Sequence, residues 1–444
     1  MITIPRMAKV LRKVFESDAR SLARSMGVIQ RERKFTGTTL ALVLVLGWLH
    51  QPQAGSSALA RFAGTLGVQI SKQGIEEHWT FQTAQWLYEV LLRAIGTLLS
   101  AKAVAVPLLR RFSSVYLEDG SSVVLPDALE RCWRGCRGGN GSSEGTKAGV
   151  KLTLRLDLVQ GTLHGPLLQE GRAHESHSLL QSVPLTKGAL WIADMGYFAL
   201  VRLAQVSQVG AYFLMPLKDG VMTWLEGKRV DILSLLQACG AEEQEYEVDL
   251  GAAKQVHCRV VARRASEEQV KRRHKKQDEY ARKHGTVVSQ RQRDWACWLI
   301  VITNVPMALL TLAEAFVLLR CRWQIELLWK LWKMQGLVDE WQTSNEQRIL
   351  CEVYAKLLGL LLQHWMLLLT CWEDPHRSWI TVSQIVRDQT VVLAHGFGGR
   401  LSLTRALRLM GEAIMQAAGR SIPGRSDRPS TSRLLLAFGE TGLT

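Results

Sequence analysis

The stretch VKLTLRLDLV, residues 150–159, gives the clearest structural signal in the chain. Its leucines at 152, 154 and 156 alternate with polar side chains, which is the period-2 pattern of a half-buried strand. A helical pattern at 198–206 and further strand patterns lie on either side, at 115–119, 122–125, 163–168, 189–193, 211–217 and 298–303. Strands in a meander followed by alternating helix and strand predict an α/β fold with a mixed sheet.

The composition is that of a globular protein. The chain has 444 residues, of which 47% are hydrophobic and 21% charged. This excludes disorder, collagen and mucin-like stalks as the main architecture. Changes of pattern predict five segments: a helical domain at 1–103, an α/β core at 104–218 and 297–372, an inserted polar domain at 219–296, and a helical segment at 373–444.

The chain is strongly basic, with 55 Lys and Arg against 40 Asp and Glu and a formal net charge of +15. An excess of this size favours a polyanionic partner, and nucleic acid is the commonest one. An anionic membrane surface and an ordinary solvated surface are the alternatives.

Location and redox state are also constrained. The longest apolar stretches, 40–49 and 357–369, fall short of the ~18–20 residues that cross a bilayer, and the first six residues lack a signal-peptide core. Only Cys132 and Cys136 of the eight cysteines lie close together, and no second ligand pair completes a zinc site. We therefore expect reduced thiols, no membrane and a cytoplasmic protein.

Residues 57–79 follow the order helix, short turn and capped helix, as in a helix-turn-helix. In such a unit Ser71, Lys72 and Gln73 would lead the second helix towards DNA bases. An ordinary helical hairpin explains the same pattern equally well.

One predicted helix, 313–337, carries a charged stripe on an otherwise apolar surface. At 100° per residue its polar members fall within about 80° of one another: Arg322, Glu326, Lys330 and Lys333. A carboxylate flanked by cations on a mostly buried helix is costly unless something compensates it. A metal or phosphate site would do so; an i,i+4 ion-pair ladder is the alternative.

Two aspartates follow apolar strands and precede glycines. These are Asp119 and Asp194. Carboxylates at strand ends gather at one edge of an α/β sheet, where ligands bind. Together with Glu326 they form an all-oxygen donor set that suits Mg²⁺. Each aspartate alone also fits an ordinary turn residue, and Glu118 and Asp157 are rival carboxylates.

These residues resemble a known family. The segment 322–333, RWQIELLWKLWK, is similar to the C-terminal signature of bacterial insertion-sequence DDE transposases of the IS-four family, which reads Tyr, two residues, Arg, three residues, Glu, six residues, Lys. Its Arg, Glu and Lys fall on Arg322, Glu326 and Lys333. The family's two Asp motifs resemble LEDGSS at 117–122 and IADMGY at 192–197.

The resemblance implies an RNase H-like core with a β-rich insertion before the helix of the catalytic Glu. Asp119, Asp194 and Glu326 would bind two Mg²⁺ ions, which Mn²⁺ can replace. Water would nick one strand at the element end, and the freed 3′-OH would attack the opposite strand or target DNA. In related enzymes the flanking end becomes a hairpin while a tryptophan stacks on a flipped base; Trp298 stands at the matching place. A core tryptophan at a strand start is the alternative for Trp298.

Two departures concern the hairpin step. The signature Tyr position is Leu319, and Lys218 stands where relatives can carry an Arg. The resemblance further implies that double-stranded DNA is the partner, both as terminal inverted repeats and as target, and that a homodimer holds two ends. Two other functions remain open: a non-catalytic DNA-binding protein derived from a transposase, and an RNase H-like nuclease without strand transfer.

Overall fold

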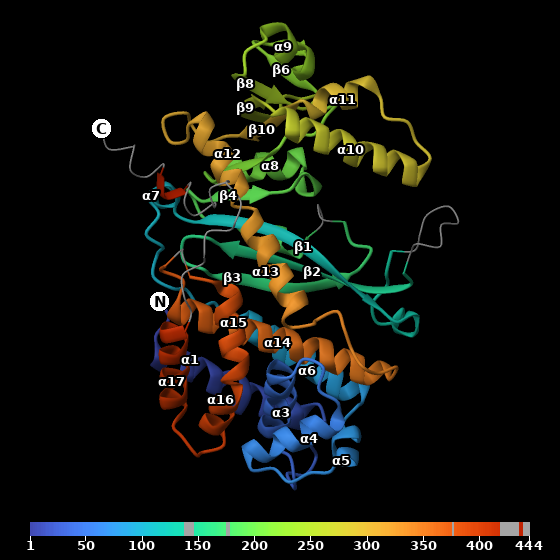
Figure 1. Cartoon of the computed structure of the whole chain (residues 1–444), viewed down its shortest axis with the longest axis vertical. Coiled ribbons are helices and arrows are strands. Elements are labelled where there is room, and N and C mark those ends of the chain that lie inside the picture. The colour runs from blue at the N-terminus through green and yellow to red at the C-terminus, as the bar shows by residue number, and fades with distance from the viewer. Residues whose placement is uncertain (137–145, 175–177, 375–376, 418–434, 438–444) are drawn as a thin grey trace. The chain divides into compact units, whose positions relative to one another are not determined.

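The computed structural model describes residues 1–136, 146–174, 178–374, 377–417 and 435–437. The chain divides into two compact units. Unit 1 comprises Met1–Ala105, Gly120–His174 and Trp323–Ser432, and unit 2 comprises Val106–Asp119, Glu175–Arg322 and Arg433–Thr444. In the described part of the chain ten strands pair in the order β3-β2-β1-β4-β5-β10-β9-β8-β6-β7 (Figure 1). The predicted mixed α/β sheet is therefore confirmed.

Unit 1 is built around a long apolar helix, α14 (Glu346–Thr370), which packs against α3 (Gly37–His50) and α6 (Phe81–Ile95) (Figure 1). By length and composition α14 could cross a membrane, but 89% of its most apolar window is buried inside the protein, as in a core helix. The other described helices of the unit are α1 (Ile4–Arg12), η1 (Lys13–Asp18), α2 (Ala19–Ser25), α4 (Ser56–Ala63), η2 (Gly64–Leu66), α5 (Lys72–Glu76), η3 (Asp127–Leu129), α13 (Trp323–Met334), α15 (Trp379–Asp388), α16 (Thr390–Phe397) and α17 (Leu403–Ala417).

A β-hairpin is tied to α14 by its turn. Strands β2 (Ala148–Asp157) and β3 (Leu163–Glu170) pair antiparallel. Gly161 in the turn has φ +71°, and a Cβ there would lie 2.3 Å from Leu368 and 2.6 Å from Trp372, so only glycine fits. The carbonyl oxygen of Gly161 lies 2.8 Å from Nε2 of His364 on α14. The hairpin and the core helix therefore meet without an intervening side chain.

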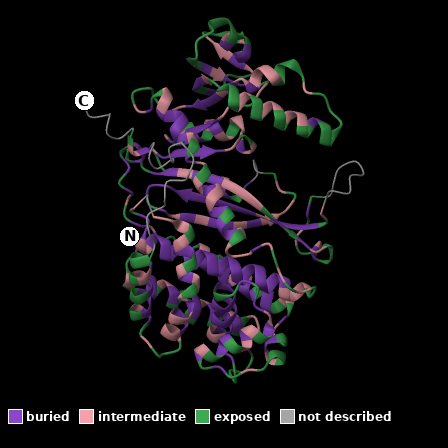
Figure 2. Ribbon diagram, viewed as in Figure 1, coloured by how far each residue is buried: buried purple, intermediate pink, exposed green. Residues whose placement is uncertain are grey.

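Unit 2 holds the parallel part of the sheet. Strand β4 (Leu190–Ala193) pairs parallel with β5 (Tyr212–Pro216) and with the start of β1 (Val115–Leu125). Helix α8 (Leu200–Gln208) packs on β5. Trp191 on β4, Phe213 on β5 and Ile302 on β10 belong to one buried hydrophobic cluster. Figure 2 shows these strands as buried ribbon.

The segment 219–296 is rich in β-strands, as the resemblance implied, and these strands extend the sheet. Strand β10 (Trp298–Thr303) lies between β5 and β9 (Val256–Arg264), antiparallel to both, and pairs with β9 over six positions. The other elements of the segment are β6 (Thr223–Leu225), β7 (Lys228–Val230), α9 (Ile232–Cys239), β8 (Glu243–Leu250), α10 (Glu267–His284) and α11 (Gln290–Ala296).

The expected continuous helix 313–337 is wrong. The chain forms α12 (Leu312–Arg320) and then α13, with a break at Cys321 and Arg322. Their amides donate to carbonyl oxygens three residues back, Leu318 and Leu319, and the Cys321 side chain is buried. The break places Arg322 at a corner instead of on a helix face. For the expected C-terminal helical segment, 418–434 and 438–444 lie outside the described residues.

Candidate active site

The register of two parallel strands brings Asp119 and Asp194 together. The register of β1 with β4 extends to Glu118 with Ala193, and Asp119 and Asp194 are the next residues along the two segments. Neighbouring strands are about 4.8 Å apart, and laterally paired residues point to the same face. Asp119 does not follow a strand as expected, because β1 continues to Leu125, whereas Asp194 does follow the end of β4.

Local backbone bonding holds Asp194 in place. Its Oδ1 accepts a hydrogen bond from the Met195 amide at 2.6 Å, which caps the 3₁₀ turn η7 (Met195–Tyr197). The side chain is 48% exposed, and its Oδ2 lies 3.8 Å from Nη1 of Arg322. The aspartate thus serves as a turn cap, as the alternative interpretation proposed, and still presents one oxygen to a cation.

The rival carboxylates are buried. Glu118 has no exposed surface and Asp157 is 3% exposed. Oδ1 of Asp157 accepts the Val159 amide at 2.9 Å and so stabilises the turn of the β2–β3 hairpin. Burial favours Asp119 and Asp194 as the accessible pair.

Two arginines fix the chain that leads to Arg322. Arg111 forms a two-bond ion pair with Glu314 on α12, at 2.9 and 3.0 Å, and also donates to the Leu309 carbonyl. Burial raises the pKa of Glu314, but the hydrogen bonds from Arg111 and Thr311 together with the charge of Arg111 outweigh it, so the pKa is lowered. The buried Arg259 donates to the carbonyls of Val305 and Leu310. The loop before α12 is therefore held on both sides.

Helix α13 belongs to unit 1 and has the predicted two faces. The apolar stripe of Ile325, Leu328, Trp329 and Trp332 is buried. Glu326 is half-buried and Lys330 is exposed. Lys333 Nζ donates to the Ser122 carbonyl on β1 at 3.0 Å and lies 3.4 Å from Asp339. The charged side chains of the signature are accordingly kept out of the core.

A buried ammonium anchors the chain just after α13. Lys356 Nζ donates to the carbonyls of Leu337 and Glu340 at 2.8 and 2.7 Å, and lies 2.8 Å from Oε1 of Glu352. Leu337 has φ +45°, which is uncommon for a residue with a branched side chain. Three acceptors on one buried cation stabilise this turn.

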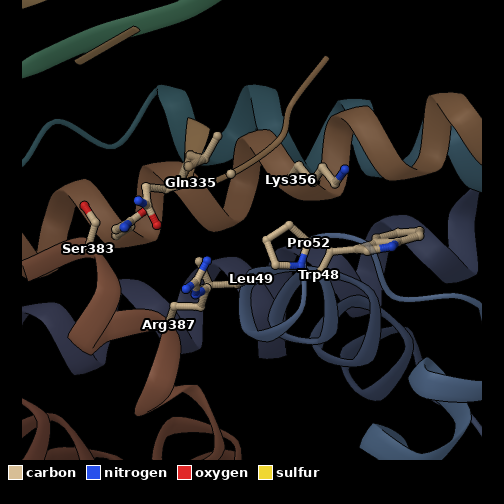
Figure 3. A pocket seen from close by; sticks show the side chains of 10 residues that line it. Trp48, Leu49, Pro52, Gln335, Lys356, Ser383 and Arg387 are labelled. Carbon is tan, nitrogen blue, oxygen red and sulfur yellow. The ribbon is translucent and has the colours of Figure 1, made fainter. Parts of the chain in front are cut away.

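A pocket in unit 1 does not resemble a metal site. It is lined by Trp48, Leu49, Pro52, Gln335, Gly336, Lys356, Leu360, Gln363, Ser383 and Arg387 (Figure 3). This lining contains no carboxylate, and Lys356 is committed to backbone carbonyls. The aspartate pair is the better candidate for catalysis.

The donor set fits a hard divalent cation, although a complete site is not gathered within the described residues. There, no group of three His, Cys, Asp or Glu side chains stands close enough to hold a metal ion. Asp119 and Asp194 carry carboxylate oxygens, the type of ligand that Mg²⁺ and Mn²⁺ prefer. Glu326, the expected third ligand, lies on α13.

Residues 110–362 match the family model described as the transposase DDE domain, which covers more than half of the chain. The chain belongs to the DDE transposase family. Similar proteins include the transposases for insertion sequence elements IS231E of Bacillus thuringiensis subsp. finitimus (26% identical, covering 77% of this chain and 75% of that protein) and IS231B of Bacillus thuringiensis subsp. berliner (25%, 80% and 78%). The transposase for IS1151 of Clostridium perfringens is 21% identical, with 80% and 79% covered.

Membership establishes the class of activity. The protein is a bacterial insertion-sequence transposase, an enzyme that cleaves DNA and transfers strands, and its family uses divalent metal. The mixed sheet with helices at both ends of the chain is consistent with the expected RNase H-like fold. The predicted resemblance is confirmed.

The transposase buries the tryptophan that was expected to stack on a base. Trp298 is 4% exposed, lies in the hydrophobic cluster of unit 2, and has the Arg264 guanidinium 5.5 Å from its ring centroid. This arrangement is that of a core tryptophan at a strand start, the alternative interpretation. Stacking by Trp298 stays a prediction that requires the ring to leave the core.

A different tryptophan of the transposase is accessible. Trp323, in the first turn of α13, is 57% exposed. The sequence contains the signal, because at 100° per residue Trp323 lies about 160° from Ile325, opposite the apolar stripe. An exposed aromatic ring three residues before Glu326 suits stacking on a nucleic acid base.

The remaining candidate DNA-binding residues are exposed. Ser71 caps α5 by accepting the Gly74 amide at 3.2 Å, as expected, and Lys72 lies 3.6 Å from Glu76. Helix α5 has only five residues, shorter than predicted, because Thr80 caps a new helix, α6. Ser71, Lys72, Gln73 and Lys218 face solvent, and base recognition by them stays a prediction.

Proposed function

We propose that this transposase excises its own element and inserts it elsewhere, with Asp119, Asp194 and Glu326 holding two Mg²⁺ ions that Mn²⁺ can replace. The observation that supports the proposal is the parallel register of β1 with β4, which pairs Glu118 with Ala193, the residues directly before Asp119 and Asp194. The signature spacing supports Glu326 as the third ligand, since it follows Arg322 by four residues.

The metal ions would activate the attacking oxygen and stabilise the leaving oxygen at a phosphodiester. The chain's own residues position the DNA around them. Arg322, whose Nη1 already lies 3.8 Å from Asp194, would hold a phosphate oxygen near the carboxylate pair. Lys330 and Lys333 would bind neighbouring phosphates from the same face of α13.

The reaction sequence begins with hydrolysis. Water breaks the phosphodiester bond at the element end and leaves a 3′-OH. That hydroxyl, on the element end, attacks the phosphodiester of the opposite strand, which closes the element end as a hairpin and releases the 3′-OH of the flanking DNA. Water then opens the hairpin, and the regenerated 3′-OH of the element attacks target DNA. Leu319 supplies no hydroxyl at the signature Tyr position, so we assign the orientation of the flanking base in this step to the exposed Trp323.

The partners follow from charge and chemistry. We propose terminal inverted repeats and target DNA as the DNA partners, bound by the N-terminal helices mainly through phosphates, with a homodimer holding both ends. The net charge of +15 supports a polyanion. All eight cysteines are free thiols, which supports a cytoplasmic location.

The test is strand cleavage on a denaturing gel. Wild-type protein should nick DNA that carries its element ends in Mg²⁺ and not in EDTA, and should join those ends to a target plasmid. Asp119→Asn and Glu326→Gln should abolish nicking and leave DNA binding nearly intact, whereas the exposed control Glu242→Gln should behave as wild type.

Each other outcome points to a different function. Tight binding with no cleavage in either condition would support the DNA-binding relic. Nicks without joined products would support a nuclease. Loss of binding together with cleavage in Glu326→Gln would overturn the metal-ligand role of that residue.

A further inference from the structure

Helix α10 is a rigid, well-capped element in the segment 219–296. Ser266 and Gln269 form a capping box at its start, and Gly285, with φ +62°, ends it. Eighteen residues at 1.5 Å per residue give a length of about 27 Å. Only one of them, Ala281, is buried, so the helix is held by polar contacts instead of a hydrophobic face.

One side of α10 is fastened to α11 and to the start of β10. Arg273 Nη1 donates to the carbonyls of Ala296 and Trp298 at 3.0 and 2.7 Å. Gln277 Nε2 donates to the Gln292 carbonyl at 2.9 Å, and His274 Nε2 lies 3.1 Å from the Arg293 carbonyl. Burial lowers the pKa of Arg273, and its Nη1 makes both of these hydrogen bonds. The helix therefore cannot roll freely.

The other side of α10 presents a cationic face. At 100° per residue six basic residues fall within a sector of about 140°, and the fastened residues are centred on the opposite side. All six are exposed: Lys271, Arg272, Lys275, Lys276, Arg282 and Lys283. Two carboxylates, Glu268 and Glu279, share the sector, which leaves a clear positive excess. Figure 2 shows α10 exposed along most of its length.

We propose that this cationic face of α10 binds the phosphate backbone of duplex DNA. The proposal rests on the transposase function and names one of its DNA-binding surfaces. Cations repeated at successive turns, about 5.4 Å apart, can follow the phosphates of one strand. Because the helix is already immobilised by the contacts of Arg273 and Gln277, binding orders only the side-chain tips.

Phosphates recognise such a face through charge, without reading bases. Every cation that neutralises a phosphate releases counterions, so log K falls with log salt by about 0.9 per contact. The salt dependence of binding therefore measures this surface directly.

The test is the triple variant Lys271→Gln, Lys275→Gln, Lys276→Gln in the full chain. Binding to a short fluorescent DNA duplex without element ends is measured in EDTA by anisotropy across a salt series. We expect the slope to fall by about 2 to 3 and the affinity at 0.15 M salt to fall roughly tenfold to a hundredfold. Gln forms helix about as well as Lys, so circular dichroism and the thermal midpoint should be unchanged.

A matched control removes three exposed cations from another surface of unit 2: Lys228→Gln, Arg229→Gln, Lys254→Gln. It has the same net charge as the test variant and should keep the wild-type slope. Equal slopes for the two triple variants would overturn the proposal. Loss of affinity for polyglutamate, with unchanged binding to the duplex, would also overturn it and assign the face to an acidic protein.

This outcome is separable from that of the proposed function. Failure of the α10 proposal leaves wild-type Mg²⁺-dependent nicking in place. Failure of the transposition proposal removes nicking but leaves the binding slope in EDTA dependent on Lys271, Lys275 and Lys276.

Discussion

Arg322 Nη1 lies 3.8 Å from Oδ2 of Asp194, and Arg322 itself stands at the break between α12 and α13. One corner of the chain thus ends the segment fixed by Arg111 and Arg259 and begins the helix of Glu326. Arg322 follows α12, whose start is held by Arg111 and Arg259, and directly precedes the signature helix α13. Substitutions there should affect chemistry more than folding.

Arg322→Gln should lower the single-turnover nicking rate by about a hundredfold or more, the loss typical of removing one preorganised charged donor. Arg322→Lys keeps the charge but loses the planar fork, so it should recover only part of the rate. DNA affinity should change little, since one contact among many is removed. Wild-type rates in both variants would show that the Asp194 ion pair has no part in the reaction.

Trp323→Ala should reduce formation of the hairpin by about fivefold to a hundredfold, because base stacking contributes ~1–3 kcal/mol. Its ring is 57% exposed, so stability should change by about 0.5 kcal/mol or less. Trp298→Ala is the contrasting variant, expected to cost ~3–5 kcal/mol of stability because the ring is buried. A normal hairpin yield in Trp323→Ala, measured on a denaturing gel, would contradict the assignment.

Lys356→Met should destabilise the protein by about 3 kcal/mol, because it leaves Glu352 buried beside only Arg348, 3.9 Å away. Burial raises the pKa of Glu352 and lowers that of Lys356, so each group depends on the other for its charge. The double variant Lys356→Met, Glu352→Met should regain most of the loss. Urea unfolding would measure both, and equal stability of the single variant and wild type would refute the pairing.

Stability should fall as the pH drops from about 6.5 to about 4, in part through His364. Burial lowers the pKa of His364 from 6.5 to about 4, so between these values the unfolded chain binds a proton that the folded chain does not. At the acid end the loss approaches ~3 kcal/mol. His364→Gln keeps a donor for the Gly161 carbonyl and should flatten this part of the profile. An equal fall in the thermal midpoint of variant and wild type between pH 7 and pH 4.5 would contradict this role of His364.

The sequence alone predicted an element correctly where a single pattern of apolar residues determined it. Strand alternation located β2 and β3, and the apolar run 189–193 located β4 and therefore Asp194. The stripe on α13 was correct because burial follows helical periodicity. Sequence alone also separated Glu118 from Asp119, since alternate residues of a strand face opposite sides.

Tertiary contacts decided the rest. Nothing in the apolar residues 313–337 marks the break at Cys321, which is accompanied by burial of that side chain. Of the strands in the segment 219–296, β9 pairs with β10 and β8 pairs with β9, and composition does not encode these pairings. Helical periodicity predicts that Trp323 is exposed. The base-stacking role was nevertheless assigned to Trp298, because that residue precedes an apolar strand.

The placement of β10 between β5 and β9 makes the segment 219–296 hard to dispense with. Deleting it would remove β9 and leave WLIVIT, residues 298–303, with unpaired backbone donors and acceptors along one side. An apolar, uncharged edge of this kind is a template for intermolecular β-pairing and aggregation. Besides any part in DNA binding, this segment therefore protects β10 from intermolecular pairing. A shortened enzyme would need a new edge strand that carries charged residues or proline.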